Sequence, residues 1–258
     1  MMKKLIALLL LMPLSLAYVI HLVTPVNTYL EPLIPVEISP VGPGYRVVLA
    51  VDRNTPENFV WDNIDMETGP NWTVTYAKDY RYIYAIIEVP VDAEEGDYLL
   101  SFVVSDRNGD HVQEDSIVRI TVTRNPNDLA EIGDLASTSL VAGNDSISFT
   151  VYNKALGEAR YRIFYSIEGI SKEYSKDVII DPNTTKSVEI PINIPNEGFY
   201  NITVRVESLD TPIINKTMSR QYYVRPTLRS KLSSIRNAFP IVPINLAPFY
   251  AILGLFLW

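Results

Sequence analysis

The sequence predicts an all-β chain folded as two tandem antiparallel β-sandwiches, and two patterns predict it. Apolar and polar residues alternate with a period of two in several segments, most clearly in residues 198–208, 145–153 and 97–106, as strands do when they bury one face. Turn-forming pairs such as Asn108-Gly109 and Pro182-Asn183 separate these segments. Short strands between closely spaced turns favour a sandwich over a helical architecture.

A repeat divides the chain into two halves. The residues EGDY at 95–98 return as EGFY at 197–200, each just before an alternating segment. Tyr98 and Tyr200 can bury their rings and donate their hydroxyls back to the preceding turn, which is the tyrosine corner of immunoglobulin-like folds. The polar, proline-bearing stretch between the halves predicts a linker and a small interface, so that each half would fold alone. The predicted order is a signal peptide (1–17), a first immunoglobulin-like sandwich (18–124), a linker (125–128), a second sandwich (129–224), a basic amphipathic juxtamembrane segment (225–237) and a hydrophobic membrane anchor (238–258).

Residues 135–208 carry a family resemblance. A strand ends in Asn153, a turn follows at 181–184, and a Gly-x-Tyr hairpin closes the segment at 198–200. This pattern resembles the CARDB/APHP-type immunoglobulin-like modules of archaeal and bacterial cell-surface proteins. The resemblance implies a cell-surface setting and brings no catalytic residues with it, and Asn183 departs from the glycine that is usual in these modules.

The N-terminus predicts secretion. Lys3 and Lys4 precede an apolar run from Leu5 to Leu14, and the small residues Ser15 and Ala17 follow it, as in a signal peptide cleaved after Ala17. The predicted N-terminal signal helix is therefore expected to be removed on export. An uncleaved membrane anchor is the alternative.

The C-terminus predicts a hydrophobic helix in the membrane. Residues 238–258 contain no charge, and as a helix they would span about 31 Å, close to the hydrocarbon core of a bilayer. Pro240, Pro243 and Pro248 interrupt this segment. A membrane-inserting tail, a gene cut short, or a peptide packed on another protein are the alternatives to an anchor.

The segment before this tail is basic and amphipathic. Leu228, Leu232, Ile235 and Phe239 follow a helical spacing, which would form an apolar stripe suited to the headgroup zone of anionic lipids. A polar stalk is the alternative interpretation. The basic residues proposed to lie near the membrane are Arg225, Arg229, Lys231 and Arg236.

Composition excludes several functions. The net charge is −8 and all 30 acidic residues precede residue 211, so the main body is acidic and unsuited to nucleic acid. There is no cysteine and there are only two histidines, and no common catalytic or nucleotide-binding motif is present. We interpret His21 as an ordinary strand residue and His111 as a solvated turn residue. The sequence therefore predicts no enzyme and no resident cofactor.

Two further segments leave alternatives open. Asp106, Asn108 and Asp110 alternate around a glycine turn and are candidate calcium ligands, since calcium prefers oxygen donors, with a solvated hairpin turn as the default. Residues 18–45 contain five prolines, which favours an edge strand of the first sandwich. A strand donated to a neighbouring subunit is the alternative.

Five sequons predict a glycoprotein. They lie mostly in or near predicted turns, at Asn71, Asn144, Asn183, Asn201 and Asn215.

Together these features predict a non-enzymatic, membrane-anchored extracellular protein of the cell envelope with a structural or adhesion-type binding role, in an archaeal setting. An accessory ectodomain subunit of a membrane protein complex is the alternative. The expected partners are membrane lipid and other envelope proteins or glycans.

Overall fold

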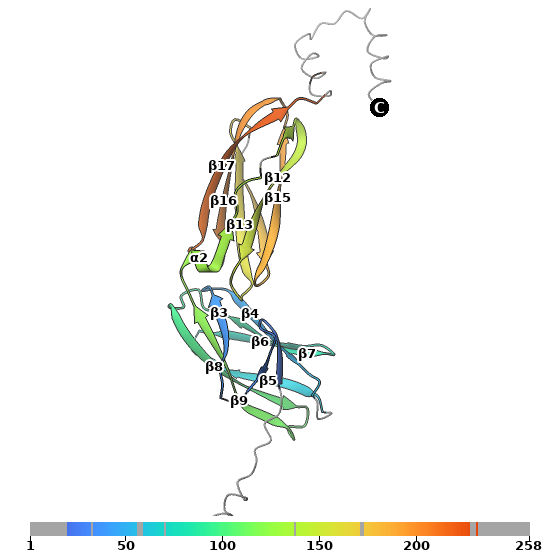
Figure 1. The fold of residues 1–258 in the computed structure, drawn as a ribbon, viewed down its shortest axis with the longest axis vertical. Coiled ribbons are helices and arrows are strands. Elements are labelled where there is room, and N and C mark those ends of the chain that lie inside the picture. The colour runs from blue at the N-terminus through green and yellow to red at the C-terminus, as the bar shows by residue number, and fades with distance from the viewer. Residues whose placement is uncertain are drawn as a thin grey trace, which may run out of the picture.

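The protein is all-β, as the alternating pattern predicts (Figure 1). The structure is a computed structural model, and it describes residues 20–31, 33–55, 59–69, 71–136, 138–170, 173–227 and 231, without the side chains of Glu114 and Asp115. The first half contains β1 (Ile20–Thr24), β2 (Thr28–Leu30), β3 (Val36–Val41), β4 (Arg46–Asp52), β5 (Trp61–Glu67), β6 (Thr73–Lys78), β7 (Tyr82–Glu88), β8 (Gly96–Asp106) and β9 (Val112–Val122). The second half contains α2 (Pro126–Leu129), β10 (Ala130–Ile132), β11 (Leu140–Val141), β12 (Gly143–Asn153), β13 (Ala159–Ile167), β14 (Tyr174–Ile180), β15 (Thr184–Ile194), β16 (Gly198–Ser208) and β17 (Asn215–Arg225).

Each half consists of two sheets around a buried core. The sheets of the first half have the strand orders β2-β1-β4-β7-β6 and β3-β9-β8-β5. Those of the second half are β10-β12-β15 and β11-β17-β16-β13-β14. The alternating residues are buried as predicted, for example Leu100, Phe102 and Val104 in β8 and Ile202 and Val204 in β16.

Apart from β2, which has no counterpart in the second half, the two halves share one topology with a single exception. In each half an early strand pairs in parallel with the last strand, β3 with β9 and β11 with β17. The strands that follow the repeated EGDY and EGFY corners, β8 and β16, occupy corresponding places beside those last strands. The exception is one strand per half, because β6 pairs with β7 whereas β14 pairs with β13. That strand therefore belongs to opposite sheets in the two halves.

The halves meet in a junction that main-chain hydrogen bonds and a buried tyrosine pair hold together. The linker is a single helical turn, α2, capped by the side chain of Asn125. Arg46 of β4 and Glu158 exchange main-chain hydrogen bonds across the junction, at 3.3 and 2.8 Å. The amide of Leu156 also donates to the carbonyl of Pro40.

Tyr45 fixes this junction through its side chain. Its ring is fully buried, and its hydroxyl oxygen lies 3.4 Å from that of Tyr161 in the second half. Burial raises the pKa of Tyr45 and raises that of Tyr161 to about 12, so both hydroxyls stay protonated at neutral pH. Gly44 has a φ of +77°, and a Cβ there would lie 2.4 Å from the carbonyl oxygen of Asp210, so only glycine fits this contact.

The N-terminal strands differ in part from the expectation. β2 and β3 are edge strands, as predicted, but β1 lies inside its sheet between β2 and β4. These strands pair within their own chain. The predicted signal peptide and the predicted anchor over 238–258 lie outside the described residues. Among the helices of the described part of the chain, none is long and apolar enough to cross a membrane.

Candidate functional site

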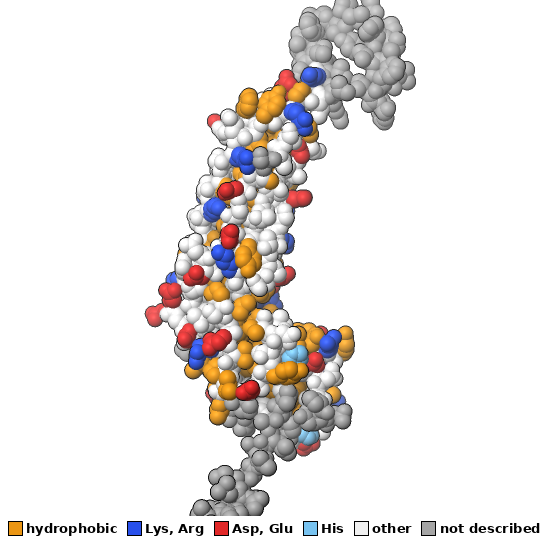
Figure 2. Space-filling model, viewed as in Figure 1, with side chains coloured by type: hydrophobic (Ala, Val, Ile, Leu, Met, Phe, Trp, Pro, Cys, Tyr) orange, Lys and Arg blue, Asp and Glu red, His pale blue; other side chains and the backbone are white. Residues whose placement is uncertain are grey.

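The outer face of the five-stranded sheet in the first half carries a group of aromatic side chains, of which Tyr29 and Tyr80 are exposed and His21, Tyr82 and Tyr84 are half-buried. Along β7, Ile83, Ala85 and Ile87 are buried, so the alternation turns Tyr82 and Tyr84 outward. Figure 2 shows hydrophobic side chains on the visible surface of this half. We call the set of Tyr29, His21, Tyr80, Arg81, Tyr82 and Tyr84 the tyrosine face.

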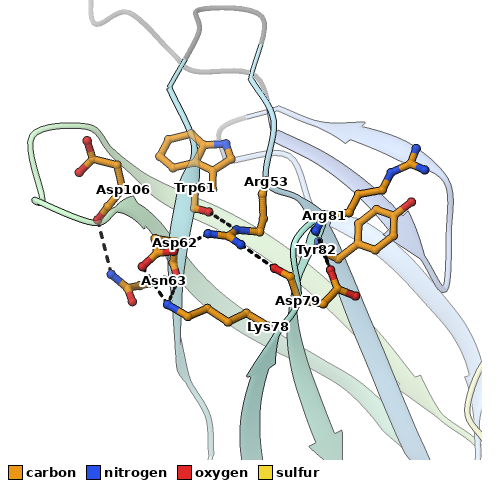
Figure 3. Close-up of polar contacts among 9 residues, drawn as sticks. All are labelled: Arg53, Trp61, Asp62, Asn63, Lys78, Asp79, Arg81, Tyr82 and Asp106. Atoms are coloured by element: carbon orange, nitrogen blue, oxygen red, sulfur yellow. Dashed lines mark hydrogen bonds and ion pairs between the residues drawn. The ribbon is translucent and has the colours of Figure 1, made fainter.

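Asp79 organises the hairpin between β6 and β7. Its carboxylate accepts hydrogen bonds from the amides of Arg81 and Tyr82, both at 2.7 Å. It also accepts the hydroxyl proton of Tyr84 at 2.7 Å. Tyr80 at the tip is 89% exposed, and the guanidinium of Arg81 lies 5.1 Å from the centre of the Tyr82 ring. The turn therefore holds Arg81, Tyr82 and Tyr84 in defined positions, and Figure 3 shows Asp79 beside Arg81 and Tyr82.

The same contacts set the charge of the hairpin. The amide of Tyr82, followed by the Tyr84 hydroxyl, lowers the pKa of Asp79. The hydrogen bond to Asp79 in turn raises the pKa of Tyr84 to about 12. The aspartate is thus ionised and the tyrosine neutral at physiological pH, which keeps this bond intact.

The opposite edge of the face is formed by β1 and β2. His21 and Tyr29 are directly opposite in the register, and their rings stack at 4.7 Å. Asp52 of β4 pairs with Tyr82 of β7. The residue that precedes Asp52 pairs with Leu22 of β1, so Asp52 lies beside His21 in the sheet. Tyr29, His21, Asp52 and Tyr82 therefore form one row across four strands, about 14 Å long at the usual strand spacing.

A polar bridge supports the face from its edge. Arg53 donates to the carbonyl oxygens of Trp61 and Asp79 and to the carboxylate of Asp62 (Figure 3). Lys78 of β6 donates to the same carboxylate at 2.8 Å and, with smaller contributions from other groups, lowers the pKa of Asp62. The bridge joins the edge strands β5 and β6 of the two sheets and borders an open groove of about 420 Å³.

The tyrosine face consists of residue types that are common in binding surfaces. Tyrosine and arginine are enriched at protein interfaces because they offer large, rigid, amphipathic contact areas. Among the residues that the structure describes, no group of three or more histidine, cysteine or acidic side chains could hold a metal ion.

The candidate calcium hairpin is organised around Asp106. Its carboxylate accepts hydrogen bonds from the amides of Asn108 and Asp110, and its second oxygen pairs with the Nδ1 of His111 at 2.8 Å. The His111 hydrogen bond is the largest of the effects that lower the pKa of Asp106. Asp106 therefore closes its own turn, and calcium binding here stays a prediction.

His111 is more than the solvated turn residue that we expected. Its ring stacks on Phe59 at 4.3 Å and only 7° from parallel, in addition to the Asp106 pair. His21 lies in β1, as predicted.

The two corner tyrosines lie at the starts of β8 and β16. The hydroxyl of Tyr98 donates to the carbonyl of Glu94 in the preceding turn, at 3.0 Å, and its ring packs on Trp72. Tyr200 is half-buried and packs against the core.

The asparagines of all five sequons are exposed. Asn71 and Asn183 have positive φ angles of 71° and 49°, and Asn183 accepts the hydroxyl of Tyr152 at 2.6 Å. Asn201 donates to Glu168 at 2.6 Å. Asn144 and Asn215 lie at or near the starts of β12 and β17.

Two of the four basic residues proposed to lie near the membrane are described. Arg225 ends β17 and is exposed, and Lys231 is exposed as well. Arg229 and Arg236 lie outside the described residues.

The sequence analysis did not identify the tyrosine face. Its signal was present in residues 76–84, where six positions are tyrosine or basic beside Asp79. The strand that follows is apolar at nearly every position, so the pattern alone could not tell its outer from its inner face.

No family model and no curated protein matches the chain. Similar solved structures include an endo-fucoidan hydrolase, MfFcnA4, from glycoside hydrolase family 107, with 14% identity, 75% of this chain and 28% of that chain covered, and a TM-score of 0.36. The titin domains z1z2 in complex with telethonin match with 12% identity, coverages of 82% and 98%, and a TM-score of 0.24. Cadherin domains 1–4 of protocadherin gamma B7 match with 11% identity, coverages of 75% and 49%, and a TM-score of 0.27.

Proposed function

We propose that this protein is a non-enzymatic, membrane-anchored extracellular binding protein of the cell envelope, built from two immunoglobulin-like sandwiches of which the second is a CARDB/APHP-type module. The parallel pairing of an early strand with the last strand in each half supports this assignment. The signal-like N-terminus, the basic segment before an uncharged C-terminus and the five exposed sequons support the envelope setting.

The tyrosine face is the observation that carries the binding role. Tyr29 is 63% and Tyr80 is 89% exposed, although burying such rings would be favourable. The contacts of Asp79 with the neighbouring amides hold the hairpin in place before any partner arrives, so little conformational entropy would be lost on binding. The partner that fits this composition is another envelope protein.

The junction favours a second candidate, an accessory ectodomain subunit of a membrane complex. Main-chain pairing of Arg46 with Glu158 and the buried Tyr45 hold the two halves in one orientation. A fixed arm of this kind would present the tyrosine face at a set distance from the second half. In that case the partner would be an integral membrane protein present in equal amount.

Co-purification after mild detergent extraction tests both candidates. The full-length tagged chain is expected to retain a partner protein that a Tyr82→Ser/Tyr84→Ser variant loses. Tyr174→Ser is the matched control, because Tyr174 is 50% exposed on the second half. Equal recovery of the partner with all three chains would remove the tyrosine face from the proposal. A partner that spans the membrane would select the accessory-subunit role.

A further inference from the structure

The outer face of the larger sheet in the second half changes character along its length. Near the first half it carries ion pairs, such as Arg162 with Asp177, 2.7 Å apart. In the middle it carries the opposed hydroxyls of Thr203 and Ser219. At the far end, where β16 begins and β17 ends, the last outward pair of β16 and β17 is Phe199 and Tyr223, one row beyond Asn201 and Gln221.

These two aromatic residues form an exposed pair. They are directly opposite in the register, their ring centres are 5.1 Å apart, and the side chains are 70% and 49% exposed. Val141 of β11 pairs with Arg225, two residues beyond Tyr223, and is itself 36% exposed. The end of the sheet thus presents two rings, an aliphatic side chain and a cation.

This end of the sheet lies where the chain leaves the second half. β17 runs away from the first half, and the chain continues from its end (Figure 1). Arg225 has no ion-pair partner among the side chains that the structure describes. The sequence after it contains three more bases, no acid, and then the uncharged residues 238–258.

We propose that Phe199, Tyr223, Val141 and Arg225 form a membrane-docking edge that lies in the headgroup region of an anionic bilayer, and this inference rests on the proposed membrane anchorage. Aromatic rings favour the interface between water and hydrocarbon. An arginine beside them can keep its charge at the level of the lipid phosphates while its stem lies along apolar surface. Docking would set the tilt of the whole ectodomain, since the junction to the first half is fixed.

The docking edge also has a consequence for glycosylation at one sequon. Asn201 lies on the same outer face, in the row next to Phe199 and Tyr223, where a bulky glycan would hold the edge off the bilayer. The inference therefore requires that Asn201 carries no glycan. The side-chain amide of Asn201 already donates a hydrogen bond to Glu168.

Lipid quenching of an introduced tryptophan tests the docking edge in the full-length chain. Phe199→Trp is placed in a Trp258→Phe background, and the protein is reconstituted in phosphatidylglycerol vesicles that contain brominated lipid. The background keeps Trp61 and Trp72 of the first half, so the emission of the introduced tryptophan is taken as the difference from the Trp258→Phe chain in the same vesicles. Since interfacial side chains lie about 5–10 Å deep, bromine near the headgroups should reduce the emission of this tryptophan about twofold.

Phe164→Trp in the same background is the matched control. Phe164 lies on the same face under Arg205, its partner in β16, and Arg205 is six residues from Phe199, or about 20 Å at the rise of a strand. Its emission should not change with brominated lipid.

Each outcome decides a different point. A protein that does not float with the vesicles would overturn the anchorage itself. A protein that floats, with equal quenching at both positions or at neither, would overturn the docking edge while the anchorage stands. A tryptophan at 199 that is shielded from acrylamide but not quenched by lipid would also overturn it, in favour of a protein partner. Glycan found on Asn201 by mass spectrometry would contradict it independently.

Discussion

Single side chains in this protein act mainly by closing turns. Asp79 and Asp106 each bind amides of their own loop. The fully buried Asn153 donates to the carbonyls of Gly157, Ile180 and Asp181 and accepts from the amide of Ala155. Such local contacts define loop shape without disulfides, because they satisfy main-chain groups that would otherwise need water.

Tyr98 should contribute strongly to stability. Tyr98→Ala removes a ring packed on Trp72 and a hydroxyl bonded to Glu94, and we expect a cost of about 3 kcal/mol in the free energy of unfolding, as for other large aromatic truncations. Tyr80→Ala, at a position 89% exposed, should change it little. Chemical denaturation of both variants compares them, and equal stabilities would refute the corner assignment.

Asp106 should make stability depend on pH. Its pKa is lowered in the folded state, so its stabilising effect is present above the unfolded pKa, about 3.9, and is lost as the pH falls through the folded value. We expect wild type to melt above Asp106→Asn at pH 7 and the difference to shrink below about pH 4. A difference that stays constant down to pH 2 would contradict the assignment.

The exposed edges of the sheets could pair with strands of other chains unless side chains cover them. β15 spans 11 residues and, among the described strands, pairs only with β12, so its other edge could recruit a further strand. Lys176 of β14 donates to the carbonyl of Glu189 in β15, and Lys186 of β15 donates to the carbonyl of Ile179 in β14. In the first half, Lys78 and Tyr76 span the corresponding opening from β6 to β5. Lysines and a tyrosine thus occupy carbonyl and amide groups that another chain could use.

Removing both lysines should open the facing edges of β14 and β15. For Lys176→Ser/Lys186→Ser we expect concentration-dependent self-association by analytical ultracentrifugation, because edge carbonyls become available for strand addition. Lys176→Arg/Lys186→Arg keeps the charges and donors and should stay as monomeric as wild type. A double serine variant that sediments like wild type at all concentrations would show that the lysines do not protect the edge.

Most strands of this fold could be predicted from the sequence, and the sheet that each joins could not. The alternation in 198–208 indicates directly which residues are buried, because one face of β16 is exposed to solvent. In contrast, β6 and β14 are both mostly exposed, so no apolar pattern tells whether they pair with β7 or with β13. The tyrosine face was missed for a related reason, because Ile83 and Tyr84 are both large and apolar.

At the scale of the whole molecule, the junction determines how the two sandwiches act together. Gly44 and Tyr45 could not be recognised as junction residues from the sequence, because their partners, Asp210 and Tyr161, lie more than a hundred residues away. A fitted junction transmits the tilt of the second half to the tyrosine face. The binding surface would then be held at one height above the membrane.

Gly44→Ala should disturb this junction. A Cβ at Gly44 would lie 2.4 Å from the Asp210 carbonyl, whereas a Cβ at Gly109 meets nothing within 4 Å at a nearly identical φ of +78°. Gly109→Ala therefore controls for backbone strain alone. We expect small-angle scattering to show a wider range of interdomain angles only for Gly44→Ala, and identical profiles for the two variants would contradict the fitted junction.

Membrane fractionation of the full-length chain tests the central claim of an anchored ectodomain most directly. We predict that the mature chain stays in the membrane pellet through carbonate and high-salt washes and is released only by detergent, whereas a chain ended after Arg225 is recovered in the soluble fraction with a cooperative melt. Recovery of the full-length chain in the carbonate wash would contradict the anchor, and with it the account of this protein as a membrane-held binding arm.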